Sequence, residues 1–106
     1  MRLGAYSLAG RFTQSAGAEI RRLIKADSWL ETGETITDVT VSIDNVTSPA
    51  FEIDRIVLGP DADRFAYYAQ GGVEGEEYVA TFTVTTSAGQ TREDEVQFAI
   101  VEVRRG

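Results

Sequence analysis

The sequence has no cysteine and no histidine, and Lys25 is its one lysine. The absence of cysteine excludes a disulfide framework and a thiolate metal site. The absence of histidine removes the commonest general base and the commonest metal ligand. A nucleophilic serine would have to rely on Lys25 for activation. We therefore expect a protein that is not an enzyme and that has no cofactor.

Long apolar runs are also missing from the sequence. No stretch approaches the roughly 20 apolar residues that a membrane-spanning helix needs. The first residues, MRLGAYSLAGRF, contain no continuous apolar core of the kind found in secretory signals. The chain has 106 residues, which is the length of one domain. We therefore expect a soluble single domain that folds in the cytoplasm and does not bind membranes.

Charge is distributed unevenly along the chain. The first 25 residues carry mostly Arg and Lys, whereas almost all carboxylates lie in residues 26–103, and the overall net charge is −7. Such asymmetry indicates a basic arm beside an acidic body. Nucleic acid is not an expected partner, because its phosphates would be repelled by the acidic body.

Residues 1–18 combine Gly and Ser with scattered large apolar side chains, at a spacing typical of neither a helix nor a strand. We interpret this segment as an extended N-terminal arm that precedes a domain of residues 19–106. Flexible linkers have few large apolar groups, so the arm is expected to pack on a partner or on the protein's own body. The candidate partner-binding residues are Arg2, Leu3, Tyr6, Leu8, Arg11 and Phe12.

The remainder of the chain reads as strand after strand, separated by Gly, Pro and Asp turns. The predicted strands are 20–26, 34–43, 51–58, 64–70, 78–86 and 93–103. A slip in the apolar alternation predicts a bulge near Thr37-Asp38, and a second phase slip lies between Ile53 and Ile56. The pattern favours an all-β fold, an immunoglobulin-like antiparallel β-sandwich with the extended N-terminal arm.

The stretch TVTTSAGQTRED (Thr83–Asp94) is rich in hydroxyls and carboxylates, yet its flanking residues predict a hairpin. The apolar residues of both flanking strands are even-numbered, so the loop must hold an odd number of residues for them to share a face. A three-residue loop, Ser87-Ala88-Gly89, satisfies this and places Tyr78 opposite Phe98. Gly89 would then take the left-handed conformation that ends such loops.

Three other features suggest chemistry but favour structural explanations. Asp61 and Asp63 have the spacing seen in calcium loops, but without further ligands they are more typical of a turn. Trp29 is more typical of a core anchor than of a binding hot spot. Consecutive Tyr67 and Tyr68 must point to opposite faces of a strand, which leaves a carbohydrate-binding surface as an alternative.

Two segments, SWLETGETI (Ser28–Ile36) and GGVEGEEYVATFTVTTSAGQTREDEVQFAI (Gly71–Ile100), together resemble a family of small bacteriophage virion proteins, the fiber–tail adaptors. The resemblance extends over residues 26–101. The segment RRLIKAD (Arg21–Asp27) departs from it, because the family usually has acidic and aromatic residues before the Trp. Residues 1–18 are not covered.

The resemblance implies an immunoglobulin-like β-sandwich in the virion that bridges the tail or neck to the fibers, without catalysis or cofactor. Its partners would be other virion proteins. Together with the apolar, basic arm, it leads us to expect repeated copies in a symmetric assembly. Two alternatives remain: a capsid or tail decoration domain, and an immunoglobulin-like module that binds carbohydrate or a host surface.

Overall fold

The computed structural model describes residues 8–26 and 29–102, which form seven strands. No helix in this described part of the chain is long and apolar enough to cross a membrane. Six of the seven strands were predicted, with ends that differ by one or two residues. The strands are β1 (Leu8–Ser15), β2 (Glu19–Lys25), β3 (Ile36–Ile43), β4 (Phe51–Leu58), β5 (Arg64–Gly71), β6 (Glu77–Thr86) and β7 (Thr91–Val101).

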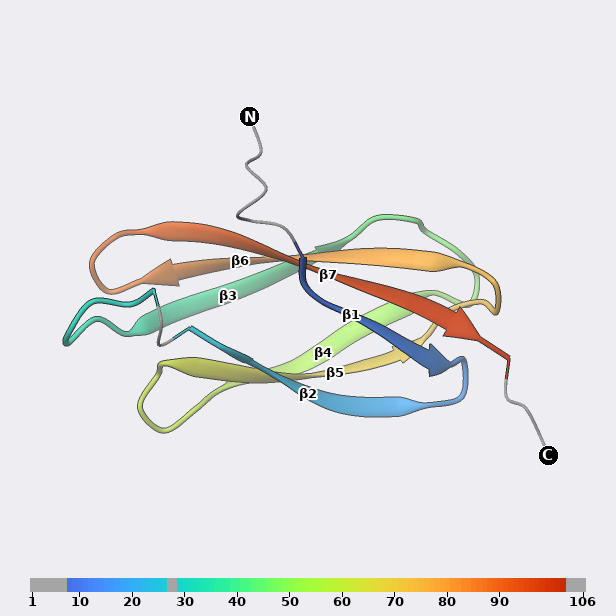
Figure 1. The fold of residues 1–106 in the computed structure, drawn as a ribbon, viewed down its shortest axis with the longest axis horizontal. Coiled ribbons are helices and arrows are strands. Elements are labelled where there is room, and N and C mark those ends of the chain that lie inside the picture. The colour runs from blue at the N-terminus through green and yellow to red at the C-terminus, as the bar shows by residue number, and fades with distance from the viewer. Residues whose placement is uncertain (1–7, 27–28, 103–106) are drawn as a thin grey trace.

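The strands form two sheets that face each other as layers (Figure 1). The four-stranded sheet has the order β1-β7-β6-β3, and the three-stranded sheet has the order β2-β5-β4. All pairs are antiparallel except β1 and β7, which run parallel. The all-β prediction is therefore confirmed, whereas the prediction of a wholly antiparallel arrangement is wrong at this one pair.

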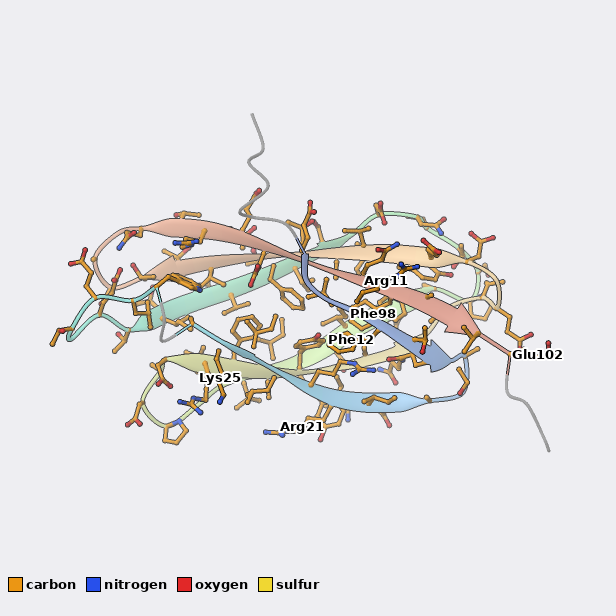
Figure 2. The ribbon with its side chains drawn as sticks, viewed as in Figure 1. Arg11, Phe12, Arg21, Lys25, Phe98 and Glu102 are labelled. Atoms are coloured by element: carbon orange, nitrogen blue, oxygen red, sulfur yellow. The ribbon has the colours of Figure 1, made fainter. Side chains whose placement is uncertain are left out.

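Strand β1 corrects the interpretation of the N-terminal segment as having no strand pattern. Phe12 lies opposite Phe98 and points between the layers, while Arg11 before it is exposed (Figure 2). The next inward position is Gln14, a buried polar residue whose amide donates to the Ala69 carbonyl at 3.0 Å. Because a polar side chain occupies an inward position, the usual apolar alternation of a half-buried strand is hidden.

The core is built largely from aromatic side chains contributed by both sheets. The Tyr67 and Phe82 ring centroids lie 4.8 Å apart, and Phe51 lies 4.9 Å from both Tyr78 and Phe98. Stacked and tilted contacts at these separations add to the stabilisation from apolar burial. Since these rings belong to β4, β5, β6 and β7, they hold the two layers together.

The predicted hairpin between β6 and β7 is confirmed. Tyr78 pairs with Phe98, and Thr86 N–H donates to the Gln90 carbonyl at 2.9 Å across the three-residue loop. Gly89 has φ 84°, the left-handed conformation that was expected. The predicted bulge is present as a register shift between Ile36 and Asp38, and the second phase slip coincides with a register shift between Asp54 and Val57.

Candidate functional site

The loop before β3 and the β6–β7 hairpin meet at one end of the sandwich. Thr35 N–H donates to Ser87 Oγ at 2.9 Å, and Ser87 N–H donates to the Thr35 carbonyl at 2.8 Å. Thr37 Oγ1 also donates to the Thr85 carbonyl at 3.1 Å. The segments SWLETGETI and TTSAG, far apart in sequence, are therefore joined directly by reciprocal hydrogen bonds.

Glu34 is the centre of this junction. Its buried carboxylate accepts hydrogen bonds from Glu31 N–H at 2.8 Å, from Thr86 Oγ1, and from Gln90 Nε2 at 2.9 Å. These bonds, the one from Glu31 foremost, hold the pKa of Glu34 below its ordinary value despite an opposing effect of burial. A carboxylate kept ionised by three donors serves as a structural acceptor and is poorly suited to proton transfer.

Trp29 and Arg92 form the side of this junction next to β7. The Arg92 guanidinium carbon lies 4.6 Å from the centre of the Trp29 ring, within the range of a cation–π contact. Trp29 is partly buried and packs against the core, as predicted, while Arg92 is exposed. A groove lined by Gln90, Thr91, Arg92 and Glu93 runs beside them. The junction therefore presents an amphipathic surface with a hollow along β7.

The consecutive carboxylates of β7 do not converge on one point. Asp94 pairs with the inward-facing Phe82 and is partly buried, whereas its neighbour Glu93 is exposed. Burial raises the pKa of the Asp94 carboxyl, and the positive charge of Arg92 opposes this only in part. The carboxylates therefore border the groove on two faces and do not form an acid–base pair.

The predicted partner-binding residues are separated by the structure. Arg2, Leu3 and Tyr6 lie outside the described residues, and Leu8 begins β1. Arg11 is exposed, with its guanidinium 3.8 Å from the Glu77 carboxylate, whereas Phe12 packs inward with its ring 5.7 Å from that of Phe98. Phe12 thus contributes to the protein's own body, and Arg11 and Phe12 do not share a surface. Their role in partner binding stays a prediction.

Arg22 of β2 was not singled out from the sequence. Its guanidinium carbon lies 3.8 Å above the Phe12 ring, and its Nη2 is 3.5 Å from Gln14 Oε1. The Nε atom is buried and has no hydrogen-bond partner among the described residues, and burial lowers the pKa of this guanidinium. Arg22 closes the space between the two sheets beside β1. The sequence feature that could have drawn attention to Arg22 is the basic segment RRLIKAD, which contains it.

The other residues considered for chemistry have structural partners. Asp63 Oδ1 accepts from Arg64 Nε at 2.9 Å, and no group of three or more acidic residues within 8–26 and 29–102 is arranged to hold a metal ion. Tyr67 is buried, which raises the pKa of its hydroxyl to about 12. Tyr68 points to the opposite face, as predicted, but the Arg55 guanidinium lies 3.9 Å over its ring. A sugar could not stack on that side of Tyr68 without displacing Arg55.

A family model described as podophage GP4 fiber-tail adaptor protein gp77 matches residues 14–100. A search of the curated proteins finds no match. The matched range includes the whole junction around Glu34, the groove beside β7, and Arg22. It excludes every one of the candidate residues from Arg2 to Phe12.

Proposed function

The chain belongs to the podophage GP4 fiber-tail adaptor family, and from this premise we propose that it joins the tail or neck of the virion to the fibers. The observation that carries this proposal is the family match over residues 14–100, which includes both segments of the junction. Because Glu34 binds the two segments together, the part of the sequence most typical of the family is also one connected structural unit.

We propose that the protein acts without catalysis. Glu34 is held ionised by donors, and Asp63 is held by Arg64. Lys25 is exposed at the end of β2. A non-catalytic adaptor acts by binding its partners, and the surfaces available for binding here are the faces and edges of the two sheets.

We propose that the sandwich is immunoglobulin-like. The orders β3-β6-β7 and β2-β5-β4 correspond to the C-F-G and B-E-D sheets of that fold, with β1 placed beside the last strand. Tyr78 stands near the start of β6, and its hydroxyl accepts a hydrogen bond from Val73 N–H at 2.9 Å. This matches the tyrosine corner, although Ala80 occupies the position of the antibody cysteine.

The residues before β1 are proposed to contact another virion protein or a neighbouring copy. Arg2, Leu3 and Tyr6 give this segment positive charge and apolar groups, and the body of the protein is acidic. Repeated copies around the tail axis would be held together by such contacts.

The adaptor role is tested by removing the gene from the phage and supplying it in trans. Particles without the protein are expected to lack fibers, and particles with it to carry them, as counted by quantitative mass spectrometry of purified virions. Normal fiber content without the protein would contradict the adaptor role. A decoration domain would instead be found on the capsid by immunogold labelling.

The role of the N-terminal residues needs a deletion that spares β1. A chain in which Met1 is followed directly by Leu8 is expected to unfold at the same temperature as the full chain but to be largely absent from particles. Arg11→Ala provides the control, since Arg11 is an exposed residue of β1 itself. If the shortened chain enters particles at normal copy number, these residues do not bind a partner.

A further inference from the structure

The first part of β7 has an uncovered edge. Strand β1 pairs with β7 only from Glu95 to Val101, although β7 begins at Thr91 (Figure 1). Residues 91–94 therefore have β6 on one side and no strand of the described chain on the other. The bond from Thr86 N–H to the Gln90 carbonyl fixes which backbone groups face β6. By alternation, the N–H and C=O groups of Thr91 and Glu93 point away from the sheet.

A groove lies along this uncovered edge, because its lining residues are Gln90, Thr91, Arg92 and Glu93. The partly buried Trp29 ring, stacked with Arg92, lies beside it. Trp and Arg are the residue types most enriched at the centres of protein interfaces. Free backbone groups beside an amphipathic aromatic side chain match what a bound strand requires, since the backbone gives affinity and side-chain contacts give specificity.

The charge beside this edge selects the type of occupant. Glu93 is exposed on the outer face, and Asp94 is partly buried on the inner face. Arg92 offsets only one of the two negative charges. The raised pKa of Asp94 shows that its ionised form is poorly stabilised by the surroundings. Cationic side chains on the two faces of an added strand would favour the ionised form of Asp94 and would complement Glu93.

We propose that the edge of β7 at residues 91–94, with Trp29 and Arg92 beside it, binds an extended segment of a different virion protein. The segment adds to the sheet as a short strand and places Lys or Arg side chains beside Glu93 on the outer face and beside Asp94 on the inner face. This inference rests on the proposed adaptor function, and it assigns one contact of the adaptor to a specific edge. An uncovered edge of this kind is otherwise a liability for uncontrolled association, which such an occupant would remove.

The edge is tested in assembled particles with a photoreactive benzoylphenylalanine placed at Thr91. Thr40 on β3, also exposed but away from this edge, carries the probe in the control. The expected result is a cross-link from position 91 to a segment of another virion protein that contains Lys or Arg, and no such cross-link from position 40. A cross-link to residues 1–7 of the same chain, or equal cross-linking from both positions, would overturn the proposal.

Two substitutions at Glu93 separate the backbone contact from the charge. Glu93→Pro removes the outward-facing N–H and is compatible with an uncovered strand edge, whereas Glu93→Gln keeps the N–H and removes the charge. Each is expected to lower the cross-link from position 91, by roughly fivefold or more for Pro. Thermal unfolding of each purified variant establishes that it is folded. An unchanged cross-link in folded Glu93→Pro would refute strand addition.

Failure of this inference can be distinguished from failure of the adaptor function. If particles need the protein for fiber attachment but neither Glu93 variant changes the cross-link or the fiber content, the adaptor function stands and the edge is not the contact. If particles without the protein keep their fibers, the adaptor function itself fails, whatever the cross-links show.

Discussion

Replacement of Phe12 by Ala tests whether β1 is an integral part of the sandwich. The Phe12 ring packs inward 5.7 Å from Phe98, and the Arg22 guanidinium carbon lies 3.8 Å from the centre of the Phe12 ring. Among residues 10–15 of β1, Phe12 is the large apolar side chain that lies between the sheets, and the substitution removes it. It also leaves the Arg22 guanidinium, whose Nε already lacks a partner, without the ring beneath it.

The expected loss of stability follows from these two contacts. Truncating a fully buried Phe costs about 3–5 kcal/mol, and a partly buried ring such as Phe12 should cost about 2 kcal/mol. Loss of the stacked guanidinium adds about 1 kcal/mol. A total of about 3 kcal/mol corresponds to a fall in Tm of roughly 10–20 °C for a domain of this size.

Urea unfolding measured by the fluorescence of Trp29, the one Trp in the chain, gives the free energy directly. Arg11→Ala is the matched control, because Arg11 neighbours Phe12 but is exposed and makes only a 3.8 Å contact with Glu77. Its cost should be at most about 0.5 kcal/mol. If both variants unfold at the same urea concentration as the native chain, β1 is not docked and the interpretation as a free arm is correct.

The remaining predictions concern two glycines and two carboxylates. Gly89→Ala should cost about 1 kcal/mol, because φ is 84° but the added Cβ meets nothing within 4 Å. Gly71→Ala should lower the free energy of unfolding several times more, since its Cβ would lie 2.5 Å from the Ala50 carbonyl oxygen. Chemical denaturation measures this free energy for both variants, and equal losses would show that the clash at Gly71 has no effect. The lowered pKa of Glu34 means that its stabilisation exists above the unfolded value of about 4.3 and is lost as pH falls through the folded value. Glu34→Gln should therefore lower Tm at pH 7, and by progressively less as the pH falls through the folded value. The raised pKa of Asp94 means that its ionised form costs stability above the folded value, so Asp94→Asn should raise Tm at pH 7, and this gain should vanish near pH 3.

Alternation of apolar residues predicted the strands that insert a regular row of side chains into the core. In β6 and β7 every even position from Tyr78 to Val84 and from Val96 to Ile100 is buried. The parity of these rows was sufficient to fix the loop at three residues and the pairing of Tyr78 with Phe98. A strict period is informative because one face of each strand is buried along its length.

Strand β1 could not be predicted in this way because its inward positions do not share a chemistry. They are occupied in turn by Gly10, Phe12 and Gln14, of which Phe12 alone is large and apolar. What stabilises the strand is long-range: the amide of Gln14 donates to Ala69, and Arg22 covers Phe12. Such contacts join residues far apart in sequence, and nothing in the local pattern of β1 indicates them.

The position of β1 also determines where the protein can interact. Had residues 8–15 been a free arm, β7 would have had an uncovered edge along its whole length, and the arm would have been the natural candidate for binding. Because β1 instead covers β7 from Glu95 onward, the uncovered backbone is confined to residues 91–94, next to Trp29 and Arg92. The β6–β7 hairpin, which is rich in hydroxyls and carboxylates, is held in place by Glu34, because Thr86 and Gln90 beside its loop donate to the Glu34 carboxylate. A rigid hairpin with a short free edge is a better acceptor for a single specific strand than a long flexible one, because less conformational entropy is lost on binding.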